Sequence, residues 1–294
     1  MISQIFIVMA PVGFISALGY MWGRKCLPFD TKMIVSLVSN VGAPCLIVST
    51  MLENQPDLRS VLDMALASLL VVLFSLLVSL LILRLSGQSV RVYLPTLTFP
   101  NSGNIGVPIC LLAFGNEGLA LSVSFFAIMA LSQFTIGVGI AAGRVSLSNV
   151  IKTPVLWALI FSMVLLSLGL SIPLPVSKSI DLVAGMVVPL MLMSLGVSLS
   201  SLRFVTFSRS ILFSVARLLI GFGVGLVVVF FLQLEGVARA AVLIQSSMPA
   251  AIFSYLFSLE HDNQPQEIAG IIMLSTILSF LTLPFLLGYV FATI

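Results

Sequence analysis

One apolar stretch, residues 92–114, contains an unusual density of polar and helix-breaking side chains. Within fourteen positions it carries Pro95, Pro100, Asn101, Ser102, Gly103, Asn104, Gly106 and Pro108. Because proline lacks a backbone donor and glycine and asparagine tolerate non-helical torsions, a helix is predicted to break here. A break leaves free N–H groups at the positive end of a helix dipole, and such an end can bind an anion.

A second apolar stretch, residues 237–258, shows the same feature more weakly, with a cluster made of Gln245, Ser246, Ser247 and Pro249. In secondary transporters, two interrupted helices at corresponding positions of two halves mark the substrate site. These two stretches are therefore predicted to bind a substrate. The alternative is a pair of kinks that serve only the packing of helices.

Two charged residues, Asp63 and Arg217, lie within apolar stretches. Charges inside a membrane are costly and often functional, so both are candidates for coupling or substrate binding. Each also lies within about three turns of the end of its stretch, from where its side chain could extend to the membrane surface. His261 is expected in a loop, and no metal site is indicated by the spacing of Cys26, Cys45 and Cys110.

The composition indicates a membrane protein. Of 294 residues, 60% are hydrophobic and 8% are charged, whereas about 25% of the residues in a soluble domain are charged. The net charge is only +3 and no basic stripe is present, so nucleic acid is not an expected partner. A spanning helix needs about 20 apolar residues, and ten spans are predicted, at approximately 3–21, 32–52, 62–83, 92–114, 118–141, 154–172, 179–200, 209–232, 237–258 and 268–291.

The basic residues near the ends of these spans indicate their orientation. The two sides of the membrane carry unequal numbers of basic residues. One side has three: Arg59, Lys178 and Arg239. The other face carries nine: Arg24, Lys25, Lys32, Arg84, Arg91, Arg144, Lys152, Arg203 and Arg209. Because basic loops stay in the cytoplasm, we predict a multi-pass protein of the cell's inner (plasma) membrane with both termini outside the cytoplasm.

The chain also shows signs of an internal repeat. A proline followed five residues later by a serine occurs at Pro44–Ser49 and again at Pro189–Ser194, an offset of 145. At an offset of 141, an amide, a small residue and a proline recur as Asn104, Gly106 and Pro108 and as Gln245, Ser247 and Pro249. Two inverted five-span halves follow, 1–142 and 154–294, joined by a cytoplasmic linker, 143–153. Chance is the alternative, since proline is common in membrane helices.

Several of these motifs resemble those of the auxin efflux carrier family. Residues 100–108, Pro-Asn-Ser-Gly-Asn-Ile-Gly-Val-Pro, are similar to the family signature P-N-x-x-x-x-G-x-P. Residues 189–199 resemble the family's seventh span, and residues 247–249, 274–276 and 283–285 resemble its ninth and tenth spans. The likeness covers nearly the full length. The short central loop resembles that of the bacterial members, which belong to the superfamily of bile acid, arsenite and riboflavin transporters.

The resemblance implies a fold of ten transmembrane helices in two inverted repeats, with a scaffold part and a transport part. It also implies that the broken fourth and ninth spans cross at Pro108 and Pro249. Plant members have an acidic and a basic residue one turn apart in the third span. Here Asp63 is followed four residues later by Ala67, so such a charge pair is in doubt.

In this family the substrates are organic anions, which include auxin in plants and malate or malonate types in bacteria. The resemblance places Asn101 and Asn104 against the substrate, with help from Ser49 and Gln133. Together with the residues of the two breaks, the expected substrate site consists of Ser49, Asn101, Asn104, Gly106, Pro108, Gln133, Gln245, Ser246, Ser247 and Pro249. Asp63 and Arg217 are the coupling candidates, and no catalytic residue, metal or cofactor is expected.

The predicted function is secondary active transport of a small organic anion, with a carboxylate favoured, by elevator-type alternating access. A sodium-coupled symporter of the related bile-acid type is the main alternative, and a passive channel is another. An intramembrane hydrolase is not expected, because the only histidine lies in a loop and no Gly-x-Ser-x-Gly motif occurs within a span. The expected partners are the substrate and the lipid bilayer. H+ or Na+ is a possible coupling ion, and a homodimer is a possible assembly.

Overall fold

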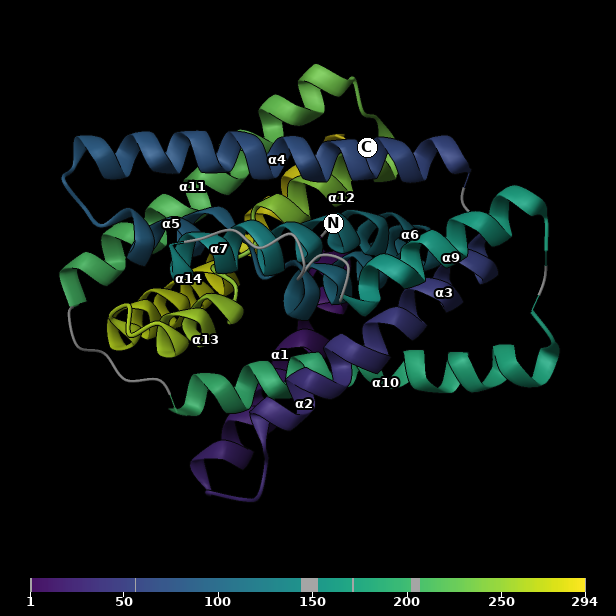
Figure 1. Cartoon of the computed structure of the whole chain (residues 1–294), viewed down its shortest axis with the longest axis horizontal. Coiled ribbons are helices and arrows are strands. Elements are labelled where there is room, and N and C mark those ends of the chain that lie inside the picture. Colours follow the sequence, from purple (N-terminus) through teal and green to yellow (C-terminus); the bar gives the residue numbers. More distant parts are fainter. Residues whose placement is uncertain (1, 56, 144–152, 171, 202–206, 294) are drawn as a thin grey trace.

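The computed structural model consists of helices of very different lengths (Figure 1). It describes residues 2–55, 57–143, 153–170, 172–201 and 207–293, and these form no β-strand. Arg144, Lys152 and Arg203, which contribute to the predicted orientation, lie outside the described residues, as does most of the predicted linker. The α-helices are α1 (Ile2–Arg24), α2 (Thr31–Leu37), α3 (Ala43–Asn54), α4 (Leu58–Leu85), α5 (Val90–Thr98), α6 (Val107–Ser132), α7 (Val138–Ala142), α9 (Pro154–Leu168), α10 (Leu174–Ser201), α11 (Phe207–Leu232), α12 (Gly236–Ser246), α13 (Phe253–Glu260) and α14 (Pro265–Thr293).

Short π-helical segments interrupt or extend several of these helices. The segment η1 (Val38–Gly42) joins α2 to α3, η2 (Ser102–Gly106) leads into α6, and η3 (Gln133–Gly137) joins α6 to α7. Such segments occur often at functional sites, because the wider turn alters the direction of the side chains that follow. All three segments lie in stretches that the sequence predicts as spans.

Each of the ten predicted apolar stretches is largely helical in the structure. Within α6, Gly115 has a φ of 62° and a ψ of −146°, a conformation that favours glycine, and it separates the predicted stretches 92–114 and 118–141. Among the described residues, the helices long and apolar enough to cross a membrane are Ile2–Arg24, Leu58–Leu85, Ser102–Ala142, Leu174–Ser200, Ser208–Leu232 and Pro265–Thr293. Shorter apolar helices span Val38–Glu53 and Pro154–Leu168. An all-helical polytopic membrane protein is thus confirmed at this level of detail.

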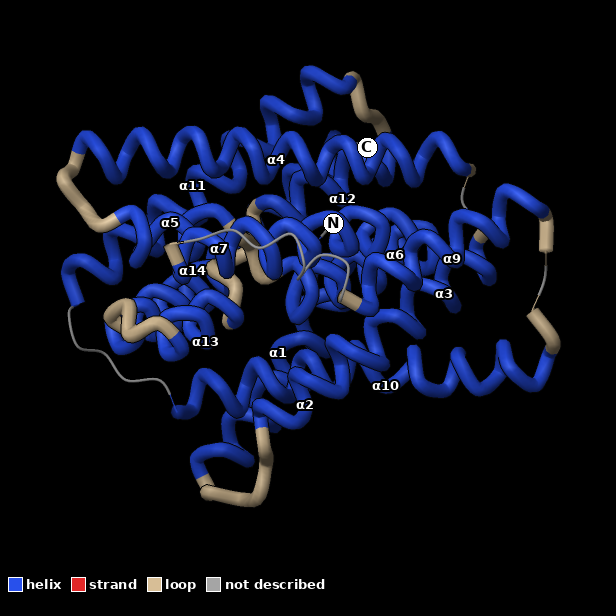
Figure 2. The backbone as a smooth tube through the Cα atoms, in the orientation of Figure 1, coloured by secondary structure: helices blue, strands red, loops and turns tan. Residues whose placement is uncertain are grey.

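Two long helices, α4 and α10, run along the long axis on opposite sides of the molecule, with other helices between them (Figure 2). One hydrophobic cluster joins α4, α5, α6, α11, α12 and α14 to parts of α1 and α10. A second cluster joins η1 and α3 to α9 and α10, around Ile47, Ala158 and Val187. The described helices therefore have two apolar cores, and the site described below lies between them.

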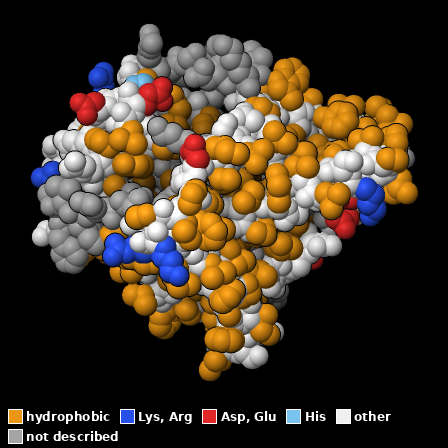
Figure 3. All heavy atoms as spheres, turned by 90° about the horizontal axis from the view of Figure 1, so that it is seen from below, with side chains coloured by type: hydrophobic (Ala, Val, Ile, Leu, Met, Phe, Trp, Pro, Cys, Tyr) orange, Lys and Arg blue, Asp and Glu red, His pale blue; other side chains and the backbone are white. Residues whose placement is uncertain are grey.

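Small residues allow α1 and α10 to pack very closely. A Cβ atom added at Gly19 of α1 would collide with the carbonyl oxygen of Met193, and one added at Gly196 of α10 would collide with that of Ser16. Between membrane helices, contacts of this kind gain van der Waals energy that larger side chains would prevent. On the face shown in Figure 3, hydrophobic side chains dominate the right and lower parts, and most of the charged side chains lie in the left half, with a small group at the right edge.

Two of the helices are broken, and the breaks pair with each other. After α5 ends at Thr98, the backbone N–H of Asn101 donates a hydrogen bond of 2.7 Å to the carbonyl oxygen of Pro249. The N–H of Ala251 donates one of 3.1 Å to the carbonyl oxygen of Phe99. We call residues 99–101 and 249–251 the crossing. Non-helical backbone in an apolar interior needs partners of this kind, and each break supplies them to the other.

The crossing corrects one expectation. The resemblance implies that the fourth span crosses at Pro108, but the residue at the crossing is Pro100, which forms an antiparallel bridge with Ala250. Pro108 lies in the first turn of α6, past the break, within the continuous helix that η2 begins at Ser102. Pro249 does lie at the crossing, as expected.

Candidate functional site

A cavity lies beside the crossing, between the two apolar cores. On one side it is lined by residues of the crossing, η2, α6, η3 and α13, and on the other by residues of α2, η1, α3, α9 and α10. None of the described lining side chains is charged. The centre of a water molecule can reach about 40 Å³ of this space, and since one water needs roughly 10–15 Å³ on this measure, the site fits a small ligand.

Two side-chain amides face this cavity without a partner. Asn101 and Gln133 both line it, and each is only 5% exposed. Neither the Nδ2 of Asn101 nor the Nε2 of Gln133 has a hydrogen-bond partner among the described residues. A buried N–H group without an acceptor costs roughly 1–3 kcal/mol. Both groups would therefore gain from a ligand that supplies oxygen atoms.

The first turn of η2 adds backbone donors to the same wall. Ser102, Gly103 and Asn104 line the cavity, and the N–H groups of Ile105 and Gly106 are the ones that bond back to the carbonyl oxygen of Asn101. The three preceding N–H groups have no acceptor within their own helix. A helix N-terminus also carries a partial positive charge. This wall of the cavity is therefore suited to an anion.

The structure brings together only part of the predicted substrate site. Asn101, Asn104 and Gln133 share the cavity, whereas the remaining predicted residues lie outside its lining: Ser49, Gly106, Pro108, Gln245, Ser246, Ser247 and Pro249. Gln245 is fully buried and donates through Nε2 to the carbonyl oxygen of Ser122 at 3.3 Å. A Cβ atom added at Gly106 would collide with the Oε1 of Gln245, so Gly106 makes room for this side chain. Both residues thus pack α12 against η2 and α6.

Ser49 lies in a different hollow, between α3, α9 and α10. Its hydroxyl donates a hydrogen bond of 2.7 Å to the Oδ1 of Asp181. Its counterpart in the predicted repeat, Ser194, does line the cavity. Of the two serines that the predicted repeat relates, the one that lines the cavity is therefore Ser194, in the second half of the chain.

The two coupling candidates have different surroundings. Asp63 lies near the start of α4 with its side chain 49% exposed and 4.0 Å from the Nε of Arg59. Arg217 is fully buried, so the interfacial alternative is wrong for this residue. It contacts the ends of α5 and α12 next to the crossing. His261 follows α13 in the loop before α14, where the sequence places it.

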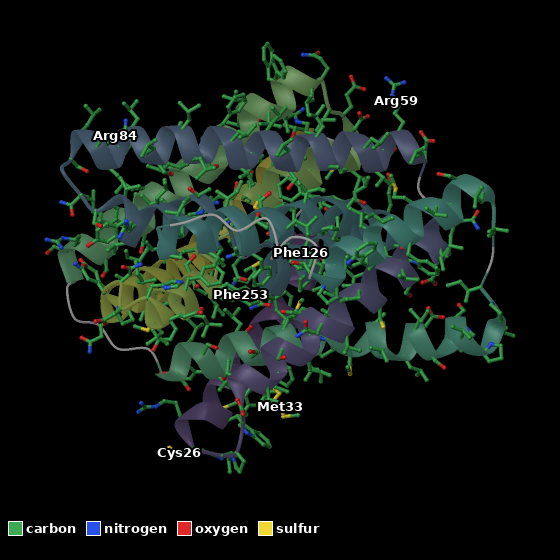
Figure 4. The ribbon with its side chains drawn as sticks, viewed as in Figure 1. Cys26, Met33, Arg59, Arg84, Phe126 and Phe253 are labelled. Atoms are coloured by element: carbon green, nitrogen blue, oxygen red, sulfur yellow. The ribbon has the colours of Figure 1, made fainter. Side chains whose placement is uncertain are left out.

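Aromatic and hydroxyl residues complete the cavity, and sequence reasoning missed them. Phe126, Phe134 and Phe253 form apolar walls, and Ser39 of η1 adds a hydroxyl. Figure 4 shows Phe126 and Phe253 near the centre of the molecule, away from its ends. Phenylalanines in an apolar chain carry no distinguishing signal, so only the break opposite them could have indicated their role. They make the cavity suitable for a ligand with an apolar part.

A larger hollow adjoins the cavity. It has a volume of about 820 Å³ and shares Ser39, Phe134, Val155 and Phe253 with the cavity lining. It extends to Thr153 and Glu260, residues next to the loops that the charge distribution assigns to the cytoplasm. The shared residues offer a short path between the cavity and this end of the molecule.

Comparison with known proteins finds related transporters. A family profile described as "Membrane transport protein" matches residues 4–145 and 140–287. Over 195 residues, 62% of this chain and 63% of the relative, the chain is 30% identical to a protein of Methanocaldococcus jannaschii named as an uncharacterized transporter. Over 192 residues, 63% of each chain, it is 29% identical to one of Methanothermobacter thermautotrophicus with the same description. The chain thus aligns with slightly less than two thirds of the length of these relatives.

Proposed function

Because this chain belongs to the membrane transport protein family, which is the family of the auxin efflux carriers, we propose that it is a secondary active transporter of a small organic anion carrying a carboxylate. Family membership makes the chain a membrane transporter, and the residues around the crossing suggest the class of substrate. The proposal rests on one observation above all: the two unpartnered amide donors that face an uncharged cavity at a helix N-terminus.

A carboxylate fits this arrangement chemically. Its two oxygens accept hydrogen bonds, and bonds to a charged acceptor are stronger than those between neutral groups. An ammonium ligand would meet N–H donors and the positive end of a helix, and among the described residues no carboxylate lines the cavity to balance its charge. The phenylalanine walls suit the hydrocarbon part of a carboxylic acid. The cavity therefore favours an organic anion over a cation.

The arrangement of helices supports ten spans in two inverted repeats, 1–142 and 154–294, joined by the linker 143–153. The first span, α1, packs on α10, the seventh, while the sixth, α9, packs on the second, α3. Such exchanged pairing is expected when two five-span halves are inserted in opposite directions and interlock. We propose that α1, α3, α9 and α10 form a scaffold and that the helices of the crossing move against it, in elevator-type alternating access.

In the proposed orientation, the nine-residue basic face is cytoplasmic, the protein lies in the cell's inner (plasma) membrane, and both termini are outside. Arg84 and Arg59, which the prediction assigns to the cytoplasmic and outer faces, lie at opposite ends of α4 (Figure 4). Because α4 is 28 residues long, it spans roughly 42 Å at 1.5 Å per residue, more than the hydrocarbon core of a bilayer.

The test is counterflow into liposomes that contain the purified protein. A thermal-shift screen of small mono- and dicarboxylates, with amines and neutral amides of matched shape, selects the compounds. We expect saturable counterflow of one or more carboxylates, blocked by unlabelled substrate. Counterflow of an amine or a neutral amide without any carboxylate would contradict the proposal. Flux that neither saturates nor shows counterflow would indicate a channel instead.

A further inference from the structure

The guanidinium of Arg217 binds the backbone of both broken helices. Its Nη1 donates to the carbonyl oxygens of Leu97 at 2.7 Å and Thr98 at 3.3 Å, in the last turn of α5. Its Nη2 donates to Ser246 at 2.6 Å and its Nε to Met248 at 3.3 Å, at the end of α12. No carboxylate of the described residues lies within 4.0 Å of its nitrogens. The charge of Arg217 is therefore balanced by carbonyl dipoles.

Two helix C-termini meet at this point. Each carries roughly half a unit of negative charge, so together they amount to about one unit, which is the charge of one monovalent cation. In transporters with broken helices, unwound carbonyls and half-helix C-termini commonly coordinate a sodium ion. Here a side chain of the protein occupies that position.

The local packing is arranged for this contact. Gly221 lies one turn after Arg217 on α11, and an added Cβ would collide with the carbonyl oxygen of Ser246 and lie 2.8 Å from the Nη2 of Arg217. Because Gly221 has no side chain, α11 approaches the end of α12 closely enough for the guanidinium to reach four carbonyl oxygens. The position of Arg217 is thus built into the packing of the two helices.

We propose that Arg217 is a tethered cation that takes the place of a coupling sodium ion, so that substrate transport by this protein does not require sodium. The inference rests on the proposed function, because it concerns the coupling of the same transport reaction. It makes Arg217 a positioning residue that holds the ends of α5 and α12 together and neutralises them. The sodium-coupled symporter, the main alternative from the sequence, is then disfavoured.

The experiment measures thermal stability and counterflow in sodium chloride and in N-methyl-glucamine chloride at matched ionic strength. For the wild type, we expect the same melting temperature and the same counterflow rate in both salts. For Arg217→Ala, which opens a carbonyl-lined space, we expect a lower melting temperature in N-methyl-glucamine. Sodium or millimolar guanidinium should raise it by about 3–5 °C, because an ion that binds only the folded state stabilises it.

Arg209→Ala is the matched control, because Arg209 lies on the same helix two turns earlier but pairs with Glu267 at 3.3 Å at a half-exposed position. This variant should show no specific response to sodium or guanidinium. If Arg217→Ala does not fold, Arg217→Lys and Arg217→Gln are compared, and the charged lysine variant should retain more counterflow and a higher melting temperature than the neutral glutamine variant.

Three results would overturn the inference. The first is a wild-type counterflow rate at least about tenfold higher in sodium chloride than in N-methyl-glucamine chloride. The others are a folded Arg217→Ala variant whose melting temperature does not respond to sodium or guanidinium, and an Arg217→Gln variant with more counterflow and a higher melting temperature than Arg217→Lys. The melting measurements need no substrate. If no carboxylate is transported in any salt, the proposed function fails, and the ion response of Arg217→Ala still tests the tethered cation separately.

Discussion

Replacing Asn101 with alanine should change binding and stability in opposite directions. The side chain is 5% exposed and its Nδ2 has no partner among the described residues. In the ligand-free protein, this buried donor costs free energy, so its removal should leave the melting temperature unchanged or raise it. In the substrate complex, the same donor would bind the carboxylate, so its removal should weaken affinity.

The size of the loss follows from the charge of the acceptor. A hydrogen bond to a charged group contributes about 1.5–3 kcal/mol, which corresponds to roughly 10–150-fold in Kd. Asn101→Asp should be worse, since two unit charges 4 Å apart repel by about 4 kcal/mol at an effective dielectric constant of 20. Affinity for the aspartate variant should recover as the pH falls and the introduced carboxyl is protonated, because the repulsion then disappears.

The assay is titration calorimetry with the carboxylate found in the screen, together with thermal unfolding of the ligand-free variants. Asn263→Ala is the control, because the Nδ2 of Asn263 donates to the carbonyl oxygen of Ala141 at 2.9 Å and lies outside the cavity lining. It should lower the melting temperature without changing the affinity. If Asn101→Ala behaves like this control, with lower stability and unchanged binding, the reasoning about the unpartnered donor is refuted.

Further predictions concern the crossing and the orientation. Ser275→Ala removes the hydroxyl that accepts the N–H of Ala250 at 3.2 Å, so a drop of about 1–3 kcal/mol in the free energy of unfolding is expected in detergent. Gly106→Ala should lower the melting temperature by crowding Gln245, and adding Gln245→Ala should restore part of it; no recovery would contradict this contact. In a variant without the native cysteines, single cysteines placed at Ser86 and at Lys178 should be labelled from opposite sides of the membrane. The cysteine at Ser86 should be accessible from the cytoplasm.

The helices could be predicted from the sequence because an apolar chain in a bilayer has few other ways to pair its backbone groups. The bounds of the ten predicted stretches follow the observed helices closely, and even the turn at Gly115 falls between two of them. The position of the crossing was harder to predict. Pro100 and Pro108 are eight residues apart, and both could end a helix; only the tertiary pairing with residues 249–251 distinguishes them.

Part of the cavity lining could be anticipated. The helix-breaking cluster indicates Asn101 and Asn104, the family resemblance indicates Gln133, and the structure places these three amides around one cavity. The choice between Ser49 and Ser194 depends on which half of an approximate repeat faces the cavity, and a motif present in both halves cannot decide this. The partners of Arg217 are backbone carbonyls, which every residue has, so no spacing of side chains could reveal them.

For an anion to bind, the negative helix ends at each break have to be compensated while the positive helix ends are left uncompensated. At the crossing, the positive N-termini of η2 and α13 adjoin the cavity, while the negative C-termini of α5 and α12 lie at Arg217. Four partial charges of alternating sign at one place would largely cancel, and the described residues that line the cavity add no charged side chain. The guanidinium offsets the negative pair without entering the cavity, so the positive pair remains uncompensated there. On this reasoning, Arg217 allows a cavity of amides, serines and phenylalanines to attract the proposed carboxylate. Replacing Arg217 with a neutral residue should therefore weaken substrate affinity as well as the stability of the fold.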